Sequence, residues 1–254
     1  MRILMTGGSG LLGSEILKLD TSIMAPSHEE MDIVHKESVE HAFEKYQPDT
    51  VLHLAAATKP PEHEKNPVIG LQNNIIGTAN VCVAAAKIKV RVVYTSTDYL
   101  YSGKGPHKEN ESFMPPYKFA WSKLGGESAV ALLQNHLILR LSFGPVPYPW
   151  DKVYKDQYNS KLYVDEMSPL ILALAQTSEE GIMNVGGPHT SLEAYARRTR
   201  PGIETIQKPT WVPEDTSLDI SRMCTVLGIN NPQTLLKHAQ TPIEASRSMK
   251  RDTE

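Results

Sequence analysis

The residues with the clearest chemical role lie near the N-terminus, in the turn Gly7-Gly8-Ser9-Gly10-Leu11-Leu12-Gly13. In such a turn Gly7 permits the sharp bend, Gly10 lets backbone N–H groups approach a pyrophosphate, and Gly13 lets a helix lie close to a strand. An apolar run, Arg2 to Thr6, precedes the turn, and a helical pattern follows it. Because a glycine pattern is specific in this strand-turn-helix context, we predict a bound dinucleotide.

The end of the second predicted strand bears on the choice between NADP and NAD. An acidic residue there would hydrogen-bond the ribose 2′-hydroxyl and select NAD. The sequence instead reads Ala-Pro-Ser-His at positions 25–28, with no acid before Glu29. We therefore predict NADP, with Ser27, His28 or Arg2 on the 2′-phosphate. NAD stays open, since a turn displaced by one or two residues would bring Glu29 or Glu30 into reach.

Short apolar runs alternate with helical patterns in the first 142 residues. The predicted strands are Arg2 to Thr6, Thr21 to Ala25, Thr50 to Ala55, Arg91 to Ser96 and Leu137 to Ser142. The predicted helices are Gly10 to Leu19, Lys36 to Tyr46, Val68 to Lys87 and Tyr117 to Leu133. This alternation predicts an α/β fold with a Rossmann-type, doubly wound parallel sheet. The last two helices are long enough to pair with a second copy as a four-helix bundle, which predicts a homodimer.

The residue composition changes after Ser142. Positions 144–150 contain Gly, Trp and three Pro residues, which break regular structure. We predict a dinucleotide-binding domain over residues 1–144, a smaller lobe, mainly substrate-binding, over 145–230, and a polar tail over 231–254 that frays from about Thr234. Within the lobe we expect a helix from Tyr163 to Gln176, a strand from Ile182 to Val185, and a helix from Ser191 to Thr199 with Ser191 as N-cap.

Composition excludes several partners. The formal net charge is −3 and the pI is near 6.3, so electrostatics favour neither nucleic acid nor an anionic membrane. No run approaches the roughly 20 apolar residues of a membrane span, and no secretory leader pattern follows Met1. The two cysteines and nine histidines are scattered without metal-ligand spacing. We expect a cytoplasmic protein with no metal.

Five segments occur in an order that resembles the extended short-chain dehydrogenase/reductases, and most of all the dTDP-4-dehydrorhamnose reductase group. They are Thr6 to Gly13, Leu54 to Thr58, Asn74 to Thr78, Thr95 to Tyr99 and Ser122 to Glu127. The resemblance covers about residues 1–230. It implies that the cofactor contacts are Gly7, Gly10, Leu11 and Leu12 at the pyrophosphate, Asp32 and Ile33 beside the adenine, and Leu54, Ala55, Ala56 and Thr58 on the nicotinamide side. It also implies a mainly structural role for Asn74.

The active site of that family is a Ser/Thr, Tyr and Lys set, and the resemblance implies Thr97 as its hydroxyl and Lys123 as its lysine. The lysine binds the nicotinamide ribose and lowers the pKa of the tyrosine, which exchanges a proton with the substrate oxygen. The tyrosine lies four residues before the lysine, on the same helix face. Phe119 occupies that position here. Without the phenolic proton, the resemblance implies a rate loss of roughly 10²–10⁴-fold.

Three interpretations of Phe119 stay open. It is an engineered Tyr→Phe replacement that traps a substrate complex, which we favour; or it is natural, with a water or Tyr117 as substitute; or the chain binds cofactor without catalysis. Tyr117 lies two residues away, about 200° around the helix, so it points away from the face of Lys123.

The leading hypothesis is an enzyme that reduces the 4-keto group of a deoxysugar nucleotide with NADP(H). The alternatives are a nucleotide-sugar epimerase, which retains NAD, and a regulatory module like the regulatory subunit of methionine adenosyltransferase, which resembles the same group. A dehydratase usually has an Asp-Glu pair after the Ser/Thr, and here only Asp98 follows Thr97.

The nicotinamide pocket is predicted to include Ser142, Phe143 and Gly144. The weaker candidates for substrate contact are Trp150, Lys152, Tyr158, Asp165 and Glu166.

Overall fold

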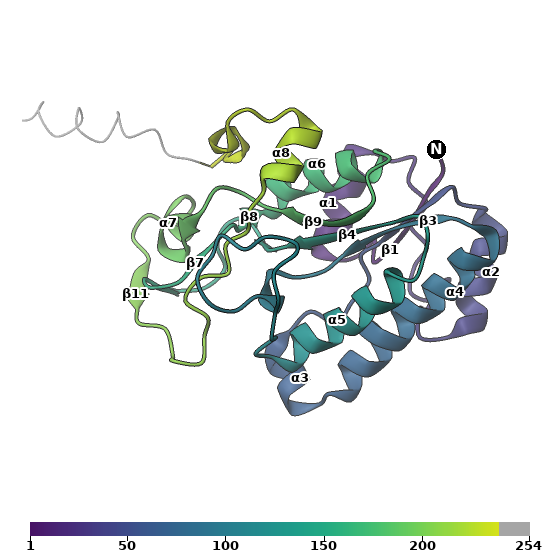
Figure 1. Cartoon of the computed structure of the whole chain (residues 1–254), viewed down its shortest axis with the longest axis horizontal. Coiled ribbons are helices and arrows are strands. Elements are labelled where there is room, and N and C mark those ends of the chain that lie inside the picture. Colours follow the sequence, from purple (N-terminus) through teal and green to yellow (C-terminus); the bar gives the residue numbers. More distant parts are fainter. Residues whose placement is uncertain (239–254) are drawn as a thin grey trace, which may run out of the picture.

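A five-stranded sheet forms the centre of the protein in the computed structural model, which describes residues 1–238 (Figure 1). The strand order is β1-β2-β3-β4-β9, and every neighbouring pair is parallel. The strands are β1 (Ile3–Thr6), β2 (Thr50–His53), β3 (Arg91–Thr95), β4 (His136–Leu141) and β9 (Gly181–Val185). The predicted α/β fold with a parallel sheet is confirmed.

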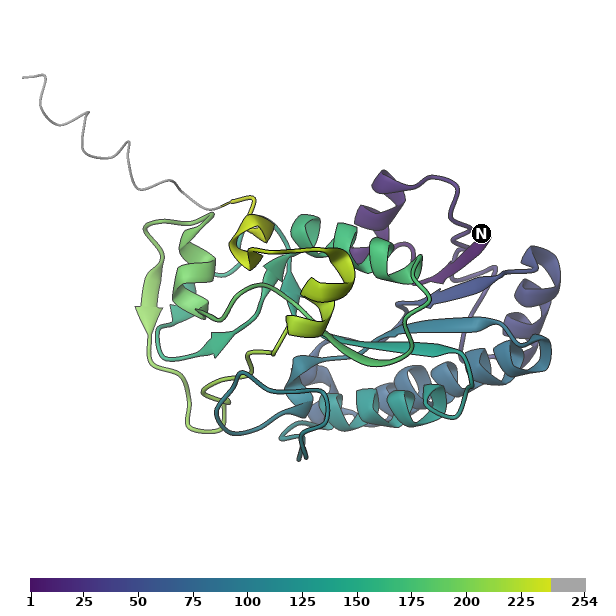
Figure 2. The ribbon, with the colours of Figure 1, turned by 45° about the horizontal axis from the view of Figure 1, so that its top comes forward.

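Helices cover both faces of the sheet (Figures 1 and 2). One face carries α1 (Leu11–Leu19), α6 (Val164–Ala175) and α8 (Ser221–Leu227). The other carries α2 (Lys36–Tyr46), the π-helix η1 (Gly70–Gly77), α4 (Thr78–Ile88) and α5 (Lys118–Val130), with the short α3 (Pro60–Lys65) beside α5. Successive strand residues point to opposite faces, so Ile3 and Met5 join one apolar core while Leu4 joins the other. No helix among residues 1–238 is long and apolar enough to cross a membrane.

Two predicted elements differ from the structure. The strand expected over Thr21 to Ala25 is reduced to a bridge between Met24 and Leu4. The Asp20 side chain accepts hydrogen bonds from Ser22 in a turn, and Pro26 has no N–H for a ladder, so only Met24 is left to pair. The helix expected over Val68 to Lys87 is divided into η1 and α4.

The smaller lobe is built from short strand pairs. These are β6 (Lys152–Tyr154) with β11 (Glu204–Ile206), β7 (Tyr158–Asn159) with β10 (Thr190–Ser191), and β5 (Phe143–Gly144) with β8 (Leu162–Tyr163). Helix α7 (Leu192–Arg197) begins where Ser191 Oγ accepts a hydrogen bond from the N–H of Ala194 at 3.1 Å, which confirms the predicted N-cap. Because β9 is a strand of the main sheet and α6 and α8 pack on that sheet, the chain beyond residue 144 contributes to the main sheet layer as well as to the smaller lobe.

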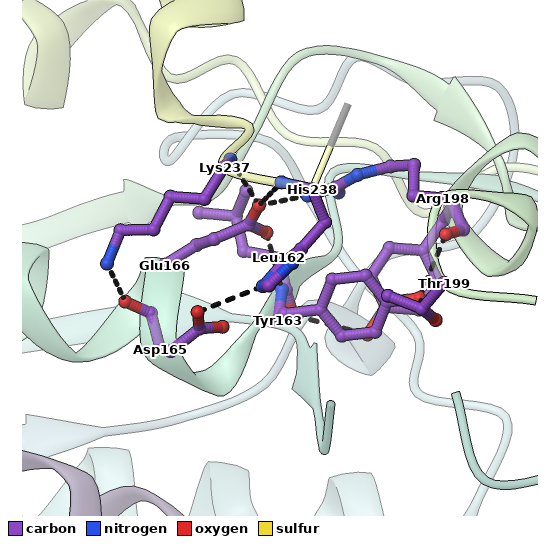
Figure 3. Close-up of polar contacts among 9 residues, drawn as sticks. Leu162, Tyr163, Asp165, Glu166, Arg198, Thr199, Lys237 and His238 are labelled. Atoms are coloured by element: carbon purple, nitrogen blue, oxygen red, sulfur yellow. Dashed lines mark hydrogen bonds and ion pairs between the residues drawn. The ribbon is translucent and has the colours of Figure 1, made fainter. Parts of the chain in front are cut away.

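The first residues of the predicted tail are packed rather than frayed. They form the 3₁₀-helix η3 (Pro232–Leu235), and Leu235 and Leu236 contact the main core. Figure 3 shows the anchor: Glu166 Oε1 accepts hydrogen bonds from the backbone N–H of Lys237 (2.7 Å) and pairs with Arg198. The segment is therefore fixed to the first turn of α6. Residues 239–254, the rest of the predicted tail, lie outside the described residues.

Candidate functional site

A cavity of about 900 Å³ lies at the carboxyl ends of β1, β2 and β3, where open α/β sheets bind their ligands. Of the predicted cofactor and active-site residues, those that line it are Gly7, Gly10, Leu11, Leu12, Ile33, Leu54, Ala55, Ala56, Thr58, Thr97, Phe119 and Lys123. Folding thus brings together residues that are up to 116 positions apart in the sequence.

Two glycines of the N-terminal turn allow backbone contacts that no side chain would permit. Gly7 has φ +74°, and a Cβ added there would lie 2.7 Å from the backbone N of Ala55. A Cβ on Gly13 would overlap the carbonyl oxygen of Gly7 and lie 2.8 Å from Gly8 Cα. Gly10, the N-cap of α1, has no capping side chain, so the first N–H groups of the helix are free for an anion at the cavity wall.

Gly13→Ala is expected to weaken dinucleotide binding and to lower the free energy of unfolding by about 1–3 kcal/mol, because the new methyl must push α1 away from the turn. Cofactor fluorescence titration and urea unfolding measure the two effects. Gly202→Ala is the matched control, since nothing lies within 4 Å of its added Cβ. Equal binding by the two variants would contradict the assigned role of the turn.

Asn74 holds the segment Ala55 to Thr58, which forms part of the cavity lining. From η1, its Oδ1 accepts a hydrogen bond from the N–H of Ala57 (2.8 Å), while Nδ2 donates to Ala57 O (2.9 Å) and to Ser122 Oγ on α5 (2.8 Å). The π-helical turn presents this side chain to both neighbours, and such turns occur often at functional sites. Asn74 is itself fully buried and outside the cavity lining, so its role is to position the segment Ala55 to Thr58.

Asp32, predicted beside the adenine, does not line the cavity, and neither do Ser27 and Arg2, two of the candidates for the 2′-phosphate. The Asp32 carboxylate accepts a hydrogen bond from the N–H of Val34 (3.0 Å) and lies 3.6 Å from both His28 Nε2 and His35 Nε2. The lining at this end comes from Pro26, His28, Met31 and Ile33. Local hydrogen bonding thus turns the Asp32 side chain back onto its own loop.

Lys123 reaches the cavity from α5, with its ammonium nitrogen 4.1 Å from the centroid of the Tyr94 ring. Burial lowers the pKa of Lys123 to about 7, although the carboxylate of Glu127 acts in the opposite direction. Thr97 follows β3 and caps the 3₁₀-helix η2 (Asp98–Leu100), where its Oγ1 accepts a hydrogen bond from the N–H of Tyr99 (3.2 Å). An amine and a hydroxyl therefore line the same cavity.

Phe119 lies one turn before Lys123 on α5, is 7% exposed, and packs edge-on against His63 with ring centroids 5.3 Å apart. Tyr117 is not part of the cavity lining. Its hydroxyl donates to Trp211 O (3.3 Å) and its ring packs against Tyr99 and Trp211. Tyr117 thus faces away from Lys123, as the helical spacing predicts.

A second cavity of about 520 Å³ extends into the smaller lobe. The two cavities share the lining residues Asp98, Tyr99, Ser142, Trp150 and Lys161. Of the weaker candidates, Trp150 and Lys152 line this second cavity, and Ser142, Phe143 and Gly144 line the first. The others lie elsewhere: Tyr158 stacks on His189, and Asp165 and Glu166 contact the C-terminal segment.

Sequence reasoning missed Lys161 and gave Asp98 no role in catalysis. Nothing in the sequence around Lys161 indicates a site, because this lysine enters the cavity only through the loop between β7 and β8. Asp98 could have been found from the sequence, because it follows the predicted active-site residue Thr97 directly.

The parallel sheet, the glycine turn at its edge and the Thr/Lys pair beside it define an α/β protein of the NAD(P)-dependent epimerase/dehydratase superfamily. Comparison with known families narrows the class, since the model of the RmlD substrate binding domain matches residues 1–144. The chain belongs to this family.

Among curated relatives, the chain is 31% identical over 162 residues to the methionine adenosyltransferase 2 subunit beta of Rattus norvegicus, covering 58% of this chain and 47% of that protein. It is 32% identical over 149 residues to the spore coat polysaccharide biosynthesis protein SpsK of Bacillus subtilis, covering 56% and 53%. The chain spans about half the length of these curated relatives.

Among solved structures, the fold resembles the dTDP-4-dehydrorhamnose reductase of Bacillus anthracis in complex with NADP, with a TM-score of 0.80, 24% identity and 89% and 92% of the two chains covered. It also resembles the UDP-glucose 4-epimerase of Thermus thermophilus in complex with NAD, with a TM-score of 0.75, 23% identity and 92% and 94% covered. At these identities the likeness shows the fold.

Proposed function

We propose that the protein reduces the 4-keto group of a deoxysugar nucleotide with NADPH. The observation that carries the proposal is a pair of neighbouring cavities with shared lining residues. The first is lined by the glycine turn, Thr97 and Lys123, and the second has polar and aromatic walls in the smaller lobe. Their volumes of about 900 and 520 Å³ suit a dinucleotide and a second, bulky polar ligand. The reductase named among the structural relatives supports the same chemistry. We propose residues 1–144 as the main dinucleotide-binding part and residues 145–230 as the main source of substrate contacts.

Each group has a defined task in this proposal. The N–H groups at the start of α1 hold the pyrophosphate, and Lys123 hydrogen-bonds the nicotinamide ribose. The reduced dinucleotide, when bound, supplies a hydride to the carbonyl carbon. Thr97 Oγ1 donates a hydrogen bond to the substrate oxygen, where negative charge develops. Phe119 contributes shape and excludes water, but no proton.

NADP suits the adenosine end of the cavity better than NAD. His28 lines the cavity and lies 3.6 Å from the Asp32 carboxylate, whereas Arg2 lies outside the lining and is paired with Asp49 at 3.1 Å. Glu30, an acid that would favour NAD, accepts hydrogen bonds from Ser27 N and Lys45. With that carboxylate occupied, His28 is the side chain that we assign to the 2′-phosphate.

The test is direct. The wild-type chain is expected to bind NADPH, measured by cofactor fluorescence, and to oxidise it when a 4-keto-deoxysugar nucleotide is added. Lys123→Met is expected to weaken NADPH binding at least about tenfold, since a charge-assisted hydrogen bond is worth about 1.5–3 kcal/mol. Lys118→Met, a change of an exposed lysine on the same helix, is the matched control. NADPH binding without turnover by any variant, including Phe119→Tyr, would exclude the reductase.

Phe119 favours a second candidate, a cofactor-binding regulatory subunit, and one curated relative is the beta subunit of a methionine adenosyltransferase. That function predicts binding without turnover. A nucleotide-sugar epimerase remains the enzymatic alternative, since one of the structural relatives is a UDP-glucose 4-epimerase in complex with NAD. An epimerase would interconvert two nucleotide sugars without net oxidation of NADPH.

We also propose that the protein is a cytoplasmic homodimer. Apolar side chains are exposed on the outer faces of η1, α4 and α5, namely Leu71, Ile76, Val83 and Trp121. These helices pack side by side, as a four-helix bundle between two copies requires. Cys82 and Cys224 are free thiols, which suits a reducing compartment.

A further inference from the structure

Asp98 is a buried carboxyl at the junction of the two cavities. It is 3% exposed, it follows Thr97 at the end of β3, and it lines both cavities. Its two oxygens have different partners: Oδ1 lies 3.3 Å from Thr97 Oγ1, and Oδ2 accepts a hydrogen bond of 2.7 Å from Thr216 Oγ1. The carboxyl thus lies directly behind the hydroxyl that faces the proposed substrate oxygen.

The hydrogen-bond capacity of Thr97 makes the protonation state of Asp98 decisive. A threonine hydroxyl has one proton and two lone pairs, and the N–H of Tyr99 already occupies one lone pair. When Asp98 is ionised, the Thr97 proton is donated to Oδ1. When Asp98 is protonated, it donates to the second lone pair of Thr97, and the Thr97 proton is free for the cavity.

The surroundings of Asp98 hold its proton within reach of neutral pH. Burial raises the pKa of Asp98 to about 6, and the hydrogen bond from Thr216 and the positive charge of Lys161 oppose this rise. The other titratable groups that face it are Tyr99 and Tyr117, and burial raises the pKa of each phenol, to about 12 for Tyr117. Both phenols are therefore poor acids beside this carboxyl.

We propose that Asp98 supplies the proton that Phe119 lacks, and that this proton passes to the substrate oxygen through the hydroxyl of Thr97. The inference rests on the proposed reductase function. A hydride from the reduced dinucleotide adds to the carbonyl carbon, and the electron pair of the C–O π bond moves to the oxygen. That oxygen takes the proton of Thr97, and Thr97 takes the proton of Asp98. Asp98 is left ionised and recovers a proton from water.

Asp98→Asn tests the relay. The amide still donates to Thr97 and accepts from Thr216, so the shape of the site is kept, but it has no proton to transfer. For the wild-type chain we expect kcat/KM to be highest below pH 6 and to fall as the pH rises through about 6, because only protonated Asp98 is active. Asp98→Asn is expected to be at least about tenfold slower at pH 6 and to lose this pH dependence.

Two controls separate a proton donor from a structural role. Tyr99→Phe removes the phenol of the residue that follows Asp98 and is expected to keep the fall in kcat/KM near pH 6. Asp165→Asn changes a carboxylate on α6, remote from the cavities, and should leave the profile as it is. Infrared spectra of the NADP-bound protein give a readout besides activity, a protonated-carboxyl band that disappears near pH 6 in the wild type and is absent from Asp98→Asn.

The outcomes distinguish this inference from the proposed function. Turnover by the wild type with an unchanged pH profile in Asp98→Asn would overturn the relay and leave the reductase intact. Turnover by Phe119→Tyr with no turnover by the wild type would also overturn the relay and leave the reductase intact. A carboxyl that stays ionised from pH 5 to 8 would also overturn it, whatever the activity. If no variant turns over, the reductase function and the relay fall together.

Discussion

Phe119→Tyr is expected to raise kcat/KM for the proposed reduction by roughly 100-fold at pH 8, within the range that a positioned general acid contributes. The phenyl ring already lines the cavity one helical turn before Lys123, and the new hydroxyl extends from its far end. At pH 8 Asp98 is ionised, so it has no proton to pass to Thr97.

The same substitution is expected to give a smaller gain at pH 5.5, where protonated Asp98 already supplies the proton. Initial rates across this pH range, with NADPH and a 4-keto-deoxysugar nucleotide, measure both effects. Tyr117→Phe is the matched control, since this tyrosine is two residues away but its hydroxyl is bonded to Trp211 O outside the cavity lining. A Phe119→Tyr variant that binds NADPH normally and is no faster at any pH would show that position 119 does not face the reacting oxygen.

Glu127→Gln is expected to lower the free energy of unfolding by about 3–5 kcal/mol, because it leaves the guanidinium of Arg140 buried without its counter-charge. The two side chains are 5% and 1% exposed. Arg140 Nε and Nη2 donate to the Glu127 carboxylate at 3.0 and 2.8 Å, and Nη1 donates to Tyr101 Oη at 2.8 Å. The pair joins α5 to β4 and thereby fixes the helix that carries Phe119 and Lys123.

Urea unfolding of matched variants measures this cost. Glu193→Gln breaks the exposed pair with Arg197 and is expected to change the free energy of unfolding by less than about 1 kcal/mol. The double change Glu127→Leu with Arg140→Met is expected to recover much of the loss, since no unpaired charge then remains buried. A loss below 1 kcal/mol for Glu127→Gln alone would mean that water reaches Arg140 in the variant.

The N-terminal half of the fold follows from local signals that act over a few residues. A glycine pattern between an apolar run and a helical pattern predicts strand, turn and helix together, because steric limits at Gly7 and Gly13 leave few other conformations. Strand β1 and helix α2 lie within one residue of their predicted bounds. The segment from Thr21 to Ala25 was predicted wrongly, because side-chain bonds of the Asp20 turn compete with the ladder.

The family resemblance implied the Thr/Lys pair and the missing phenol at position 119, and helical spacing keeps Phe119 and Lys123 one turn apart whatever the rest of the chain does. Asp32 could not be placed in this way, because its own loop decides where the carboxylate points. The contribution of Lys161 could not be predicted either, since this lysine lies 63 residues after Asp98 in the sequence and reaches the cavity only through the loop between β7 and β8.

By itself the sequence determined the parallel α/β fold and the turn suited to a pyrophosphate, both of which depend on short-range sterics and periodicity. The missing phenol at position 119 is what the family resemblance implies. Only the tertiary structure decided which groups surround Thr97. Burial at the junction of the two cavities raises the pKa of Asp98. Thr216, which is 118 residues away in the sequence, donates a hydrogen bond to one oxygen of this carboxyl. Long-range packing therefore sets the acidity of this site, since a carboxyl changes its pKa through the solvent and charges that folding brings to it.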